Sequence, residues 1–267
     1  MNTPQWNERI KALADSVRDK PVIKKTPDKV AVIVEPRVTQ VLPDLLTWMI
    51  HLLSPHGWTF VVYCGTLNEH LLKDFDVEVR QLSKENLRTE DYNALFLSPK
   101  FWEYMPFENI LIFQTDAVLI DGNLDEFLKY DYVGAPWHKN QHWRQNGPMT
   151  LFKLSGTGLS RITPTAHLTG NGGLSLRRRS AMLRGIQNVK YKNTNEDYFF
   201  SVNCRHLINI SPPEIAMRFA VETVFCPDTI GFHACWRYLP DDQMAWIYSR
   251  LESVAGQESC VGVLSNE

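Results

Sequence analysis

Several signatures that would assign this chain to a common protein class are missing from its 267 residues. No apolar run approaches the roughly 20 residues that span a bilayer, and the chain contains no CxxC pair. No GxGxxG follows the first apolar run, and GxxxxGK[ST] and GxSxG are absent. These absences argue against a membrane span, against paired-cysteine chemistry, and against the usual dinucleotide, P-loop and serine hydrolase sites.

Size and composition are those of an ordinary globular chain. With 44% apolar residues, the chain can bury the core of one large α/β domain or of two small ones. The first 20 residues lack the apolar core of a signal peptide and predict a short exposed helix. The five cysteines are odd in number and unevenly spaced, which favours reduced thiols and a cytoplasmic location.

Acidic residues are absent between Asp131 and Glu196. This interval predicts either a surface for an anion or a solvated face on which the charges never converge. Nucleic-acid binding is disfavoured, because aromatic residues are not regularly interleaved with the basic ones and the whole chain is acidic. The interval carries ten basic residues: Lys139, Arg144, Lys153, Arg161, Arg177, Arg178, Arg179, Arg184, Lys190 and Lys192.

Apolar periodicity predicts an alternation of strands and helices in the first half of the chain. Such an order implies a mixed, mostly parallel sheet flanked by helices, in which ligands bind beyond the carboxyl ends of the strands. Glu35-Pro36-Arg37 and Gln114-Thr115-Asp116 follow two of these ends. The predicted strands are 30–36, 58–63, 76–82 and 110–113, and the predicted helices are 41–53, 67–74 and 88–105, the last interrupted at Ser98-Pro99.

The second half is less regular. Residues 138–170 are mostly polar, with scattered glycine and proline, and a connection of this length is typical of a functional segment. Order resumes with a strand at 172–176 and a helix at 180–187. A further helix begins at Asn195, a good N-cap residue, with Glu196 and Asp197 in its first turn. Further elements are expected as an opening at Pro212-Pro213, strands near 221–226 and 229–232, and a tail helix with a frayed end after 241.

Asp116 poses a question of charge. It closes an apolar strand and is followed by more apolar residues, and a carboxylate in such a place must be paired or bound to a metal. A plain loop or a helix cap would also explain the three polar residues Gln114, Thr115 and Asp116. A zinc site built from Cys226, His233 and Cys235 is disfavoured, because their spacing matches no common structural zinc site.

Four segments resemble, in order and spacing, the motifs of glycosyltransferases with the A-type nucleotide-sugar fold. ILIFQTDAVLIDGNLDEF is similar to the Asp-x-Asp signature between two strands, and TGNGGLSLRRRSAM resembles the stretch that lines the donor-sugar pocket. NEDYFF resembles the acidic pair of inverting members, and GFHACW the C-terminal element that contains a histidine. Together with YDYVGAPW, these motifs look like a little-characterised glycosyltransferase-like branch.

The resemblance implies transfer of a sugar from a UDP- or GDP-type nucleoside diphosphate sugar to a hydroxyl acceptor, expected to be a glycan. A divalent cation, Mn²⁺ or Mg²⁺, would neutralise the leaving diphosphate, with Asp116 and His233 as its protein ligands. Gln114 stands where the family has its first aspartate, and a neutral amide cannot share the charge of the metal. His233 can also be read as a core histidine.

The resemblance assigns further roles. Asp197 would be the general base of an inverting reaction, with Glu196 orienting the acceptor or the base; both acids can equally complement the helix dipole. For the remaining positions an ordinary turn or an aromatic core is the alternative reading. The predicted donor-binding residues are Glu35, Arg37, Lys100, Gln114, Thr115, Asp116, Trp137, Asn171, Gly172 and Gly173.

The domain expectation is an N-terminal helical lead at 1–27, one glycosyltransferase-like domain at 28–240, and a C-terminal tail at 241–267. Two rival functions remain open on the sequence. One is a retaining glycosyltransferase, which would not need a base such as Asp197. The other is a non-catalytic protein of the same fold that binds a glycan or a nucleotide, a reading that Gln114 favours and the acidic pair opposes.

Overall fold

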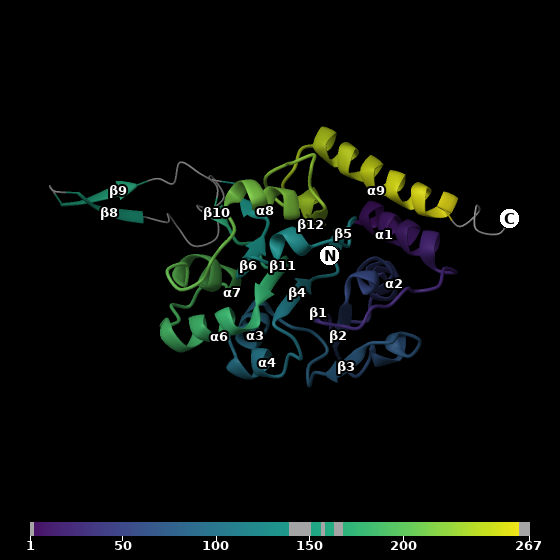
Figure 1. The fold of residues 1–267 in the computed structure, drawn as a ribbon, viewed down its shortest axis with the longest axis horizontal. Coiled ribbons are helices and arrows are strands. Elements are labelled where there is room, and N and C mark those ends of the chain that lie inside the picture. Colours follow the sequence, from purple (N-terminus) through teal and green to yellow (C-terminus); the bar gives the residue numbers. More distant parts are fainter. Residues whose placement is uncertain (1–2, 139–150, 156–157, 163–167, 262–267) are drawn as a thin grey trace.

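The β-branched run that begins at Lys29 forms the central strand of a six-stranded sheet (Figure 1). The computed structural model describes residues 3–138, 151–155, 158–162 and 168–261. The strand order is β3-β2-β1-β4-β11-β6; the first four strands run parallel, and β11 is antiparallel to both of its neighbours. The strands are β1 (Lys29–Val34), β2 (Trp58–Cys64), β3 (Glu78–Gln81), β4 (Asn109–Phe113), β6 (Tyr132–Gly134) and β11 (Leu174–Arg178).

The connections of this sheet create a switch point. The chain passes from β1 to β2 and β3 on one side, and then returns to β4 on the other side of β1. The carboxyl ends of β1 and β4 therefore diverge from a shared crevice, and this is where open α/β sheets bind their ligands.

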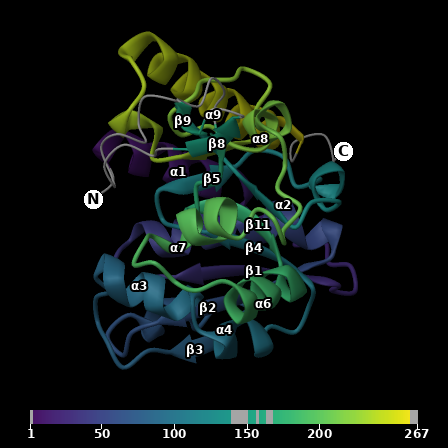
Figure 2. The same cartoon turned by 90° about the vertical axis from the view of Figure 1, so that its left-hand side faces the viewer.

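Helices cover both faces of the sheet, because alternate strand residues point to opposite sides. Ala31 and Ile33 of β1 face the core beneath α1, α2 and α9, whereas Val30 and Val32 face the core beneath α3, α4 and α6 (Figures 1 and 2). The helices of the first layer are α1 (Pro4–Val17), α2 (Val41–Leu53) and α9 (Asp241–Val261), and those of the second are α3 (Thr89–Phe96), α4 (Pro99–Glu103) and α6 (Arg179–Asn188).

The N-terminal helix is packed rather than exposed, which corrects the sequence prediction. Thr3 caps α1 by accepting a hydrogen bond from the backbone N–H of Trp6. Trp6, Ile10 and Leu13 recur at helical spacing and are fully buried against α2 and α9. The polar residues between them hide an amphipathic stripe that the composition of the segment does not reveal. α9 likewise buries Ile247 and Leu251, so it belongs to the core instead of forming a free tail.

Several smaller elements complete the chain. The predicted helix at 67–74 is only the 3₁₀ turn Glu69–Leu72, and the predicted strand at 221–226 is wrong, since only Val221 forms a bridge, to Phe232. The part of the chain that the structure describes also forms three short antiparallel strand pairs, and one of them lies within the irregular segment 138–170. The remaining elements are β5 (Ala117–Leu119) with β12 (Gly231–His233), β7 (Pro136–Trp137) with β10 (Leu168–Thr169), β8 (Leu151–Ser155) with β9 (Gly158–Ile162), α7 (Glu196–Tyr198), the π-helix Phe199–Asn203, α8 (Pro213–Phe219), and the 3₁₀ turns Ser54–His56, Asp125–Phe127 and Cys235–Arg237.

The predicted fold class is confirmed: one α/β domain with a mixed, mostly parallel sheet flanked by helices. Cys64, Cys204, Cys226 and Cys235 are buried free thiols, and Cys260 lies outside the described side chains. Within the described ranges, none of the helices combines the length and the apolarity needed to cross a membrane.

Candidate functional site

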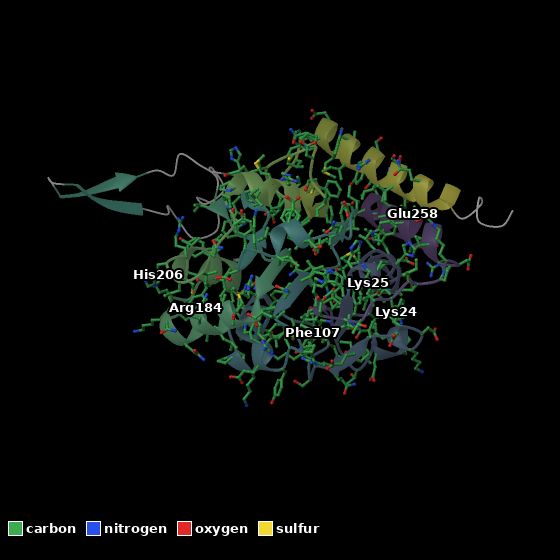
Figure 3. The ribbon with its side chains drawn as sticks, viewed as in Figure 1. Lys24, Lys25, Phe107, Arg184, His206 and Glu258 are labelled. Carbon is green, nitrogen blue, oxygen red and sulfur yellow. The ribbon has the colours of Figure 1, made fainter. Side chains whose placement is uncertain are left out.

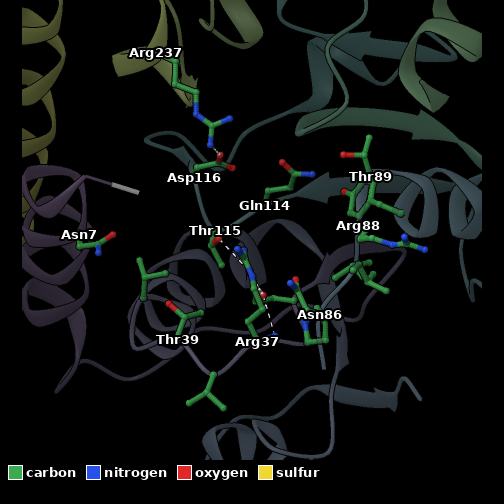
Figure 4. A pocket seen from close by; sticks show the side chains of 17 residues that line it. Asn7, Arg37, Thr39, Asn86, Arg88, Thr89, Gln114, Thr115, Asp116 and Arg237 are labelled. Carbon is green, nitrogen blue, oxygen red and sulfur yellow. Dashed lines mark hydrogen bonds and ion pairs between the residues drawn. The ribbon is translucent and has the colours of Figure 1, made fainter. Parts of the chain in front are cut away.

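A cavity of about 740 Å³ opens at the switch point between β1 and β4 (Figure 4). Glu35 and Arg37 enter it from the end of β1, and Gln114, Thr115 and Asp116 enter it from the end of β4. The start of α3, with Arg88 and Thr89, forms one wall, while Arg237 and Asn7 of α1 close others. This is the edge of the sheet at which the sequence predicts a ligand.

Glu35 organises the β1 side of the cavity. Its carboxylate is buried and accepts hydrogen bonds from the Arg37 backbone N–H at 3.0 Å and from Arg37 Nε at 2.7 Å. The Thr115 hydroxyl donates to the other oxygen at 3.2 Å. The hydrogen-bonded ion pair with Glu35 raises the pKa of the half-exposed Arg37 guanidinium, despite the opposing effect of burial. A permanent positive charge is thus held at the mouth of the cavity.

Asp116, His233 and Glu222 form a row of buried groups. His233 Nε2 lies 3.4 Å from Asp116 Oδ1, and His233 Nδ1 lies 3.3 Å from Glu222 Oε1. Burial alone would disfavour the imidazolium, but the two carboxylates outweigh it and raise the pKa of His233 to about 10. His233 is therefore a cation at neutral pH, placed between two anions.

Arg237 supplies the second cationic partner of Asp116. Its Nη2 atom lies 3.2 Å from Asp116 Oδ2 (Figure 4). A tight turn brings it there: Ala234 has φ of 47°, a left-handed conformation that is costly for a non-glycine residue, and its N–H donates to the Asp116 carbonyl at 2.8 Å. Two protein cations thus compensate for the burial of Asp116. Burial alone would raise the pKa of this carboxyl group, but His233 and, to a smaller extent, Arg237 lower it below the ordinary value.

Two glycines separate this row from the predicted base. A Cβ on Gly173 would lie 2.1 Å from His233 Nε2, and a Cβ on Gly172 would lie 3.0 Å from the Asp197 Cβ atom. Asn171 holds this stretch in place: its amide donates to Glu222 at 2.7 Å, and its carbonyl oxygen accepts from the Gly173 N–H at 2.9 Å. Glycine is required here because side chains approach the backbone from both sides.

The Gly173→Ala substitution should displace the His233 ring and weaken its contact with Asp116. The added methyl has no room, so we expect a loss of about 1–3 kcal/mol of stability, as for overpacked cores. Gly256 on α9, where a Cβ meets nothing within 4 Å, provides the matched control. Chemical denaturation of the two alanine variants measures the difference. Equal stability of the two variants would contradict the close packing.

Asp197 lies on the far side of the glycine pair. Its Oδ2 accepts from the Gly172 N–H at 3.2 Å and its Oδ1 from the Tyr198 N–H at 2.7 Å. The pKa of Asp197 is raised to about 7, mainly by desolvation and secondly by the neighbouring negative charge of Glu196. This carboxylate can therefore exchange a proton near neutral pH, as a general base must.

Glu196 has a different role in the structure. Its side chain is 4% exposed, and both of its oxygens accept hydrogen bonds from the fully buried guanidinium of Arg177. This leaves it no exposed oxygen for an acceptor, although it can still fix the position of Asp197. Asn195 does not cap the helix with its own side chain. Instead, Asn93 of α3 accepts from the Glu196 N–H at 3.0 Å and donates to Asn195 at 3.3 Å.

The structure does not bring every predicted residue to the cavity. Lys100 is exposed on α4, away from the cavity lining. The other predicted residues that do not line the cavity are Trp137, Asn171, Gly172, Gly173, Glu196, Asp197 and His233. Trp137 is buried, and its ring stacks on Tyr198 with 6.5 Å between centroids, which places it close to the Asp197 turn. Glu222, Arg237 and Arg177 were not predicted as site residues. Glu222 carries the same signal as Asp116, a carboxylate within an apolar run.

The basic interval does not form one anion-binding surface in its described part. Arg177 binds Glu196, Arg178 and Arg184 bind Asp131, and Arg179 binds Glu108. Arg184 projects from the outer surface of the molecule (Figure 3). Lys190 and Lys192 are exposed, whereas the side chains of Lys139, Arg144, Lys153 and Arg161 lie outside the described ones.

The residues present fit a divalent cation only in part. Asp116 Oδ1 and His233 Nε2 are 3.4 Å apart, near the ~3 Å that separates two neighbouring ligands on one ion. However, Asp116 already binds two protein cations, and the described residues contain no cluster of three or more His, Cys, Asp or Glu side chains that could hold a metal. A cation would need the ligand in the cavity to complete its coordination.

Residues 76–233 match the family described as "Protein of unknown function (DUF5672)". The chain belongs to this family. The matched region holds Gln114–Asp116, Asn171–Gly173, Asp197 and His233, but not Glu35, Arg37 or Arg237. A comparison with curated proteins gives no match.

Solved structures resemble the chain only distantly. The 4-diphosphocytidyl-2C-methyl-D-erythritolsynthase of Anaerococcus prevotii DSM 20548 is 10% identical, with a TM-score of 0.37, over 65% of this chain and 83% of that one. A197 from STIV is 14% identical, with a TM-score of 0.33, over 68% of this chain and 79% of that one. Similarity of this degree adds nothing about function.

Proposed function

We propose that this protein is a glycosyltransferase that moves a sugar from a nucleoside diphosphate sugar to an acceptor hydroxyl, with inversion. One observation carries the proposal. The Gly172–Gly173 pair contacts the Asp197 base on one side and His233, bound to Asp116, on the other. A sugar bound beside this buried stretch, with its diphosphate in the cavity at the switch point, would have its acceptor on the Asp197 side. The motifs quoted above supply the family resemblance.

The cavity offers guanidinium groups that a diphosphate could bind, although each of them already has a carboxylate partner. Arg37, Arg88 and Arg237 line it, against the two carboxylates of Glu35 and Asp116, each of which is paired. Guanidinium groups bind phosphate oxygens in a bidentate manner and keep their charge at every relevant pH. These arginines would stabilise the negative charge that develops on the departing diphosphate.

Asp197 would act on the acceptor. In its ionised form it takes the proton of the acceptor hydroxyl while that oxygen forms a bond to the anomeric carbon. The bond from this carbon to the phosphate oxygen breaks, and the electron pair leaves with the nucleoside diphosphate. The proton ends on Asp197 and returns to water when the products leave.

A divalent cation, Mn²⁺ or Mg²⁺, is part of the proposal. Asp116 would hold it together with the diphosphate, and His233 would join them after losing its proton, since only a neutral imidazole binds a metal. The cation would add positive charge to the leaving group. The three arginines perform the same task within the chain itself.

A second candidate is a non-catalytic protein that binds the same class of ligand. The pairing of Asp116 with Arg237 favours it, because a carboxylate that already has two cationic partners has less need of a metal. Gln114 at the first position of the motif points in the same direction.

A thermal-shift screen of UDP- and GDP-sugars, with and without Mn²⁺, tests the proposal. A donor at about 100 times its Kd stabilises the folded chain by about 2.7 kcal/mol, which raises the Tm by roughly 5–10 °C. Asp116→Asn should lose the part of the shift that depends on Mn²⁺. Asp121→Asn, the same change at an exposed position five residues along the chain, should keep it. If no nucleotide sugar shifts the Tm of the unaltered chain, the proposed function is wrong.

A further inference from the structure

Tyr92 lies on α3 and lines the cavity. Its ring packs on Phe96, with 4.7 Å between the ring centroids. Its hydroxyl oxygen is buried, and no described residue lies within hydrogen-bonding geometry of it. The Gln114 side chain interacts with this hydroxyl closely enough to lower its pKa against the larger effect of burial, but the pair falls outside normal hydrogen-bond geometry.

A buried hydroxyl without a partner is unfavourable, because it loses its hydrogen bonds to water and gains none. Tyr132 shows the usual solution in the same protein: its buried hydroxyl donates to the Gly170 carbonyl at 2.8 Å. Tyr63 uses its hydroxyl to accept from Arg80 at 2.9 Å. Other buried polar atoms of the described residues also have no hydrogen-bond partner, for example Trp6 Nε1 and Ser211 Oγ, but of this group Tyr92 is the residue that lines the cavity.

The surroundings of Tyr92 define what its hydroxyl can do. Desolvation, followed by the negative charge of Glu196, raises the pKa of Tyr92. The hydroxyl therefore keeps its proton and can donate a hydrogen bond. The next residue, Asn93, binds Asn195 and the Glu196 N–H. α3 therefore connects the floor of the cavity directly to the turn that carries Asp197.

We propose that the Tyr92 hydroxyl is a ligand-binding group that donates a hydrogen bond to an oxygen of the molecule bound in the cavity. The inference rests on the proposed function, under which this oxygen belongs to the nucleoside diphosphate sugar. The Tyr92 hydroxyl would then have a hydrogen-bond partner only when the nucleoside diphosphate sugar is bound.

The first experiment needs no ligand. Tyr92→Phe removes a hydroxyl that has no partner, so the Tm of the free protein should remain within about 2 °C of the original or rise. Tyr132→Phe is the matched control: it leaves the Gly170 carbonyl without its donor and should lower the Tm by roughly 3–8 °C. If Tyr92→Phe lowers the Tm as much as Tyr132→Phe does, the hydroxyl has an internal partner and the proposal is wrong.

The second experiment measures binding by calorimetry with UDP, GDP, UDP-glucose and GDP-mannose. Tyr92→Phe should weaken the binding of whichever of these the unaltered chain binds by about 5- to 50-fold. Unchanged affinity would overturn the role of Tyr92 and leave the proposed function intact. If the unaltered chain binds none of the four, the proposed function fails, and the assignment of Tyr92 to this ligand fails with it.

Discussion

Asp197→Asn is expected to slow sugar transfer by about 10³-fold, and to abolish the decrease of protein stability between pH 4 and 8. The first effect follows from the loss of a general base, which contributes about 10²–10⁴ to a rate. Asparagine keeps the size of the side chain and one carbonyl acceptor, so donor binding should survive. A retaining transferase or a non-catalytic binding protein would show no such loss.

The second effect follows from the pKa of about 7, against an ordinary value of 3.8. The folded chain binds the Asp197 proton more tightly than the unfolded chain does. The contribution of Asp197 to protein stability is therefore fully present below about pH 3.8. It is lost as the pH rises toward 7, because the carboxylate must then ionise inside the folded protein. Asparagine removes this penalty and with it the pH dependence. It keeps only one of the two oxygens that accept from the Gly172 and Tyr198 N–H groups, so above pH 7 we expect its stability to lie within about 1 kcal/mol of that of the unaltered chain.

Urea denaturation between pH 4 and 8 measures the effect on stability, and turnover of the sugar donor over the same pH range measures the effect on the transfer rate. The activity of the unaltered chain should rise with pH and level off above about pH 7. Asp74→Asn, the same change at an exposed carboxylate remote from the cavity, should alter neither quantity. Full activity in Asp197→Asn would remove the base from the mechanism.

Local patterns predicted those features that depend on neighbouring residues. The strand from Asn109 to Phe113 is a continuous apolar run, and the register that sets it beside β1 follows from parallel packing on both faces. The two polar ends, at Glu35 and at Asp116, therefore meet at one edge, as the sequence predicts. The motif resemblance led us to expect Asp116 and His233 side by side, and the structure places them 3.4 Å apart.

Features that depend on distant partners were not predictable in this way. Arg237 follows a left-handed Ala234, and only the fold shows that this turn delivers a guanidinium to Asp116. The packing of α1 required knowledge of α9, more than 220 residues away along the chain. Arg177 was read as one charge among ten in a basic interval, although its partner Glu196 lies just beyond the end of that interval.

Arg177→Met is expected to produce the largest loss of stability, about 3–5 kcal/mol. The guanidinium is completely buried and is surrounded by aromatic rings, with the Tyr132 and Phe96 centroids at 5.0 and 5.3 Å. It also binds the Ser175 hydroxyl at 2.9 Å and the Gly172 carbonyl at 3.3 Å. Removing it leaves the Glu196 carboxylate buried without a counter-ion, which is the costly state.

A double variant separates the pair from its parts. Arg177→Met with Glu196→Leu removes both charges, and Met fits an aromatic cage, so more than half of the lost stability should return. Arg218→Met breaks a half-exposed pair with Glu126 and should cost less than about 1 kcal/mol. Urea denaturation of the unaltered chain, the two single variants Arg177→Met and Glu196→Leu, and the double variant gives the coupling energy, with Arg218→Met as the control. A loss in Arg177→Met no greater than in Arg218→Met would show that the buried charge is stabilised by something other than this arginine, and that the Asp197 turn does not depend on it.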